Sequence, residues 1–90
     1  MSDFFHRVAP GAAADIERLS RLLYELRENR QHLLAQYAVA DETALLARIR
    51  QREVAEHPAY DHYLGACILR QAQAAARAEL QQLTAVAQQQ

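Results

Sequence analysis

Apolar side chains recur every three or four residues along the first long polar segment of the chain. The positions are Ile16, Leu19, Leu23, Leu26, Leu33 and Tyr37. One position of the same series, Arg30, is charged. A stripe of this period and width is typical of a helix that packs along another helix, as in a coiled coil. The pattern therefore predicts a helix from about residue 12 to residue 38.

Two further helices are predicted after this one. Asp41 is a favourable N-cap for a short amphipathic helix over residues 41–54. Pro58 suits the first turn of a second long helix, over residues 58–87, because its missing N–H would be unpaired there anyway. The order long, short, long predicts an all-α domain, an antiparallel helical hairpin or three-helix bundle.

The second long helix contains a segment, residues 63–69, that is apolar on every side. Such a segment must be covered from several directions, and three helices of this size cover two at most. We therefore expect a homodimer or a docked partner, with Leu64, Cys67, Ile68, Leu69 and Arg30 at the interface. Arg30 has two interpretations: it fixes the register of the pairing, or its side chain reaches water over a slightly bent helix.

The composition agrees with a single domain over residues 1–90. The chain is 51% hydrophobic with two glycines and two prolines, but alanine, which buries little area, supplies much of the apolar content. Residues 1–11 form a short lead-in that ends in a predicted turn at Pro10-Gly11. Phe4 and Phe5 in this lead-in either cover one end of the helical core or form an arm that docks on another molecule.

Every basic residue is an arginine, which we interpret as the codon bias of a high-GC bacterial source. The formal net charge of −1 argues against a general nucleic-acid binder, which normally has a basic excess. An alternative function nevertheless remains open on the short helix. Arg48, Arg50 and Arg52 there could contact the backbone of a nucleic acid if the protein is a helical dimer.

A polar cluster before and within the second long helix suggests a second alternative. Glu53, His57, Asp61 and His62 supply two imidazoles and two carboxylates, which is a suitable ligand set for a metal ion. Pro58 interrupts the helical spacing of these residues. The same side chains are therefore also explained as a helix start, with His57 as a cap and Asp61 near the positive end of the helix dipole. Such an end could respond to pH.

Cys67 is the one cysteine and has apolar neighbours, so it is predicted to be a buried structural thiol and to form no internal disulfide. No signal-peptide pattern and no segment of membrane-spanning length is present. The chain also has no phosphate-binding loop and no catalytic or cofactor motif. These observations predict no enzyme and no cofactor. They favour a small cytosolic interaction module (an adaptor, chaperone or regulatory subunit) that acts as a homodimer or with another protein.

Overall fold

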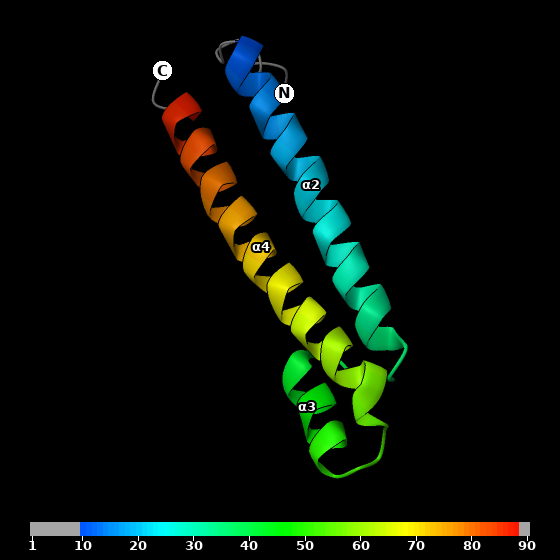
Figure 1. Ribbon diagram of the computed structural model, residues 1–90. Helices are drawn as coiled ribbons and strands as arrows, with labels where there is room; N and C mark the ends of the chain where they lie inside the picture. Colours follow the sequence, from blue (N-terminus) through cyan, green and yellow to red (C-terminus); the bar gives the residue numbers. More distant parts are fainter. Residues whose placement is uncertain (1–9, 89–90) are drawn as a thin grey trace.

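The computed structural model describes residues 10–88, and these residues form three helices with no strand (Figure 1). Helix α2 spans Pro10–Ala35, α3 spans Glu42–Arg50 and α4 spans Glu56–Gln88. The two long helices lie side by side and antiparallel, and α3 packs against α4 at the end of the hairpin away from the termini. The all-α prediction with its long, short, long order is confirmed. The molecule is a slender hairpin that measures 55 × 18 × 16 Å.

The beginning of α2 differs from the prediction. Pro10 and Gly11 are the first two residues of the helix and do not form a turn. Proline is well placed there because the first N–H groups of a helix have no intrahelical partner. The rest of the lead-in predicted over residues 1–11, with Phe4 and Phe5, lies outside the described residues.

The carboxyl end of α2 is closed by a residue in the left-handed conformation. Ala38 has φ 53°, and its N–H donates to the carbonyl of Ala35 at 3.0 Å. The next N–H, that of Val39, donates to the carbonyl of Leu34 at 3.4 Å. Val39 also packs against Leu34, so the segment has both the hydrogen bonds and the hydrophobic contact of a Schellman motif. The predicted end at residue 38 therefore lies within this cap.

The carboxyl end of α3 repeats this arrangement, with Arg52 as the left-handed residue at φ 62°. The N–H groups of Arg52 and Glu53 donate to carbonyls in the last turn at 3.0 and 2.9 Å. The helix therefore ends at Arg50, and the predicted extension to residue 54 is wrong. Glycine is the usual residue at such a cap, and the sequence offered no glycine to mark either helix end.

Ala38→Gly is expected to raise the free energy of unfolding by about 0.5–1 kcal/mol, because glycine adopts positive φ without a Cβ clash. Chemical denaturation monitored by circular dichroism measures this change. Ala78→Gly is the matched control, since Ala78 is an exposed residue inside α4 and loses about 1 kcal/mol on the same change. A loss of stability in both variants would contradict the cap assignment.

The starts of α3 and α4 follow the sequence signals. The Asp41 carboxylate accepts a hydrogen bond from the Ala44 N–H at 2.8 Å, so the predicted N-cap is confirmed. Although α4 is bounded at Glu56, His57 has an extended backbone with φ −108° and ψ 120°. Regular helical geometry therefore begins at Pro58, as the restriction on a residue before proline predicts.

The hydrophobic core lies where the three helices meet. Leu34 of α2, Leu45 of α3 and Ala66 of α4 are almost completely buried there. Five half-buried residues surround them: Leu33, Tyr37, Val39, Ile49 and Tyr63. Leu34 and Leu45 are the largest fully buried side chains of the described residues. This junction fixes α3 on one side of the hairpin.

Candidate functional site

The charged position in the apolar stripe, Arg30, forms an ion pair inside the chain. Its guanidinium donates two hydrogen bonds to the carboxylate of Glu42, one of them at 2.8 Å from Nη2 to Oε1. The Glu42 side chain is 8% exposed, and Arg70 of α4 approaches it from the solvent side at 3.8 Å. One carboxylate at the start of α3 therefore connects all three helices.

The hydrogen bond from Arg30 lowers the pKa of Glu42 below its ordinary value of 4.5, and it raises the pKa of Arg30. Burial of the Glu42 carboxylate acts in the opposite direction but is the smaller cause. The carboxylate therefore stays ionised in the folded chain at neutral pH. Arg30 was predicted either to fix the register of a helix pair or to reach water with its side chain. Neither interpretation predicted Glu42 as its partner.

A second polar contact joins the carboxyl end of α2 to α4. The Tyr37 hydroxyl is hydrogen-bonded to Nδ1 of His62, and the two rings are tilted with centroids 5.5 Å apart. The carbonyl of Tyr37 accepts a hydrogen bond from Arg48 of α3. These contacts hold the turn after α2 in place and point to a structural role.

The four residues predicted as metal ligands are not brought together. The Glu53 carboxylate lies 3.1 Å from Arg48, and His62 is directed towards Tyr37. His57 and Asp61 remain as an exposed pair with 3.8 Å between Nδ1 and Oδ2. Within residues 10–88, no group of three His, Cys, Asp or Glu side chains is arranged to hold a metal ion.

The three arginines of the nucleic-acid alternative also separate. Arg48 contacts Tyr37 and Glu53, and Arg52 adopts the left-handed position that closes α3. Arg50 lies instead beside an open hollow of about 430 Å³ between α3 and α4. The other lining residues of this hollow are Leu46, Ile49, Glu56, Tyr60 and Tyr63.

The two tyrosines of this hollow stack with centroids 5.8 Å apart and an interplanar angle of 26°. A side-chain hydrogen bond with Cys67 raises the pKa of Tyr63. The partly buried Cys67 thiol is therefore next to a phenol. Tyr60 and Tyr63 therefore form a packed aromatic surface between α3 and α4.

At the end of the hairpin away from the termini, helix α3 covers one side and leaves the opposite side open. Leu45 and Glu42 contact Leu34, Ala66 and Arg70, which all lie on the side of the seam that faces α3. On the other side the Leu33 side chain of α2 reaches α4, since its Cδ2 would lie 3.7 Å from a Cβ at Gly65, an ordinary packing contact. No third helix of the described chain covers this approach.

Helical periodicity places a set of apolar residues on this uncovered side, interrupted on α4 by Glu79. We call them the open flank: Leu22, Leu26 and Leu33 of α2, with Ile68, Leu69, Ala72, Leu83 and Val86 of α4. Leu22, Ile68 and Val86 form its outer edges and are 39%, 64% and 51% exposed. The remaining residues of the open flank are half-buried.

The predicted interface residues are divided by this geometry. Ile68 and Leu69 belong to the open flank, whereas Leu64 is 41% exposed outside it and Cys67 lies beside Tyr63, near the Arg30–Glu42 pair. Arg30 is occupied by Glu42 within the chain. Sequence reasoning missed Leu22 and Val86, although Leu22, Leu26 and Leu33 follow the same three-to-four spacing as the main stripe.

The architecture defines the protein as a helical hairpin closed at one end by a short third helix. The chain belongs to the Uncharacterized protein MJ0235 family, whose model matches residues 16–88. This match includes all of α3, the Arg30–Glu42 pair and the open flank. Comparisons with curated proteins and with solved structures find no match.

None of the helices within residues 10–88 combines the length and apolar character needed to cross a bilayer.

Proposed function

We propose that this protein is a small, non-catalytic interaction module of the bacterial cytosol, an adaptor, chaperone or regulatory subunit, that works as a homodimer. The open flank carries the proposal. It is a long apolar surface that the helices within residues 10–88 leave uncovered. Contiguous apolar surfaces of this kind typically mark sites of protein association.

The dimensions of the open flank agree with a dimer interface. Helix α2 has 26 residues and is therefore about 39 Å long, at a rise of about 1.5 Å per residue. With a width of 18 Å for the hairpin, this side offers about 700 Å² per copy. Two copies would bury about 1,400 Å², which is within the range of stable, specific complexes.

The charge on this surface favours a second copy of the chain. Between Ile68 and Val86, Glu79 is the one charged residue of α4 on this side. Two copies of an apolar surface with few charges can pack against each other, because there is little like-charge repulsion between them.

Sedimentation equilibrium of the full chain tests the proposal. The expected mass is twice 10.2 kDa at micromolar concentration. Ile68→Glu should give a folded monomer, because Ile68 is exposed in the single chain and a charge there disturbs only the interface. Gln81→Glu is the control: it adds the same charge to the same helix at an exposed position off the flank. A wild-type chain that stays monomeric at all concentrations would overturn the proposal.

A further inference from the structure

We infer that the second copy lies antiparallel across the open flank, with the twofold axis beside Leu22, so that Arg18 of each copy faces Glu25 of the other. This geometry rests on the proposed homodimer and specifies its face, direction and register. Three features of the described residues support it independently: the charges beside Leu22, the surface around it, and the side-chain sizes along α4.

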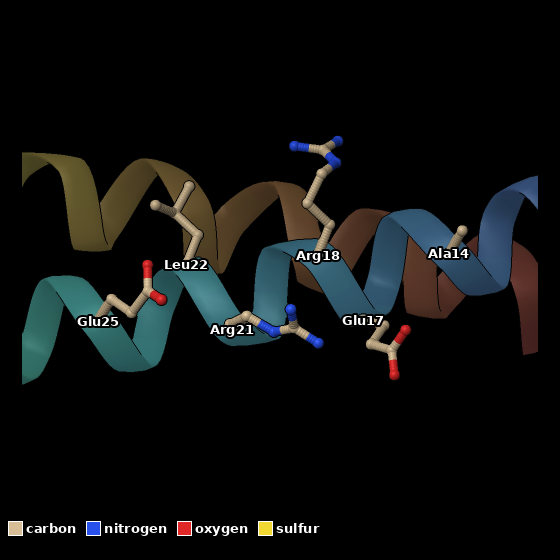
Figure 2. A pocket seen from close by; sticks show the side chains of 6 residues that line it. All are labelled: Ala14, Glu17, Arg18, Arg21, Leu22 and Glu25. Carbon is tan, nitrogen blue, oxygen red and sulfur yellow. The ribbon is translucent and has the colours of Figure 1, made fainter.

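The charges on α2 have opposite signs on the two sides of Leu22. Arg18 precedes it by four residues and Glu25 follows it by three, and Figure 2 shows Leu22 between them along the helix. When a helix pairs with an antiparallel copy of itself, residues equally distant from the axis face each other. The midpoint of residues 18 and 25 is 21.5, beside Leu22. An axis there brings each arginine to a glutamate, twice in the dimer.

These two charges are available for such contacts. Arg18 has only a weak local contact in the single chain, with Asp15 at 3.5 Å, and its side chain is 64% exposed. Glu25 forms no ion pair with any residue in the 10–88 range. Opposite charges at the edges of an apolar helix seam are the usual determinants of pairing direction in coiled coils.

The surface around Leu22 is hollowed. An open hollow of about 360 Å³ is lined by Ala14, Glu17, Arg18, Arg21, Leu22 and Glu25 (Figure 2). All six residues belong to α2, and the hollow meets the open flank at Leu22. In the antiparallel arrangement Leu22 of the second copy therefore lies at the edge of this hollow, beside Leu22 of the first.

The side-chain sizes on α4 place the axis at the same level. The large residues of the open flank on α4 form two groups, Ile68 with Leu69 and Leu83 with Val86, and Ala72 and Glu79 lie between them. The midpoint of the outermost pair, Ile68 and Val86, is residue 77, twelve positions beyond Gly65. Because Gly65 lies level with Leu33, residue 77 lies level with residue 21 of α2. The sizes on α4 and the charges on α2 therefore indicate one axis.

A different twofold axis, along the hairpin, would place α2 against the partner's α4. By the same register Arg18 would then lie near Glu79, whereas Glu25 would lie level with the uncharged Gln73. The antiparallel arrangement pairs both charges of α2, and the alternative pairs only Arg18. This difference distinguishes the two dimers by experiment.

Charge exchange measured by sedimentation equilibrium tests the geometry. Arg18→Glu alone should weaken dimerisation about tenfold or more, because two attractive contacts become repulsive. The double variant Arg18→Glu/Glu25→Arg should return to within about threefold of wild type. An equimolar mixture of Arg18→Glu and Glu25→Arg chains should form the heterodimer preferentially. Arg27→Glu, the same change on another face of α2, is the control and should leave the affinity unchanged.

Crosslinking gives a second readout. A short bis-maleimide should join two chains of Leu22→Cys in a Cys67→Ser background, and should not join chains that carry only Cys67. Rescue of Arg18→Glu by Glu79→Arg, or crosslinking through Cys67 and not through position 22, would overturn this geometry while the homodimer stands. A monomeric wild-type chain would overturn both proposals.

Discussion

Glu42→Gln is expected to lower the free energy of unfolding by about 2–3 kcal/mol. The substitution keeps the shape of the side chain but leaves the Arg30 guanidinium, 19% exposed, without its counterion inside the helix junction. Arg70 loses its 3.8 Å contact as well. Urea denaturation at pH 7, monitored by circular dichroism, measures the change.

A matched surface pair provides the control for this prediction. Glu53→Gln removes the same charge from the Arg48–Glu53 pair, whose side chains are 35% and 48% exposed. Exposed ion pairs contribute about 0–1 kcal/mol, so this variant should differ little from wild type. Equal losses in the two variants would show that the Glu42 pair has no special role in joining the helices.

The pH dependence of stability provides a further readout at Glu42. Its folded pKa lies below the unfolded one, so its stabilisation is complete above about pH 4.5 and is lost as pH falls through the lower folded value. Wild type should therefore lose more stability than Glu42→Gln as the pH is lowered through this range. A constant difference between the two from pH 6 to pH 2 would exclude the ion pair as its cause.

Leu45→Ala is expected to have the largest effect on the single chain, about 3 kcal/mol. Leu45 is fully buried against Leu34 and Ala66, and α3 has nine residues, too few to be stable without this contact. Amide exchange should show α3 losing protection before α2 and α4. Leu46→Ala, at a half-buried position facing the tyrosine hollow, is the control and should cost about 1 kcal/mol.

The helices were predictable because their signals are local. The apolar stripe of α2, the Asp41 cap and the start at Pro58 each depend on a few neighbouring residues, and the structure contains all three. The end of α3 was not predictable from such signals. Arg52 occupies a conformation that glycine usually marks, and the tertiary contacts of Arg48 with Tyr37 fix that end.

The partner of Arg30 could not be identified from the sequence. Glu42 is twelve residues away, and its position depends on the direction in which α3 returns over the hairpin. The metal hypothesis was limited in the same way, because spacing alone cannot show that His62 turns towards Tyr37. An arginine within an apolar stripe was nevertheless a valid signal that a buried carboxylate lies near it.

The two ends of the hairpin are packed very differently, and this affects how the chain folds and persists. Near Leu34 the hairpin is packed by large side chains and by α3, whereas towards the termini Ile16 and Leu19 of α2 are buried with the small Ala76 and Ala87 of α4 and without α3. The terminal end should therefore open first and most often, as a local unfolding unit. In an antiparallel pair, the end of each copy that contains α3 packs towards the terminal end of the other copy. Association then adds stability to a chain that also folds alone, and dilution would make the terminal end open more often to proteases.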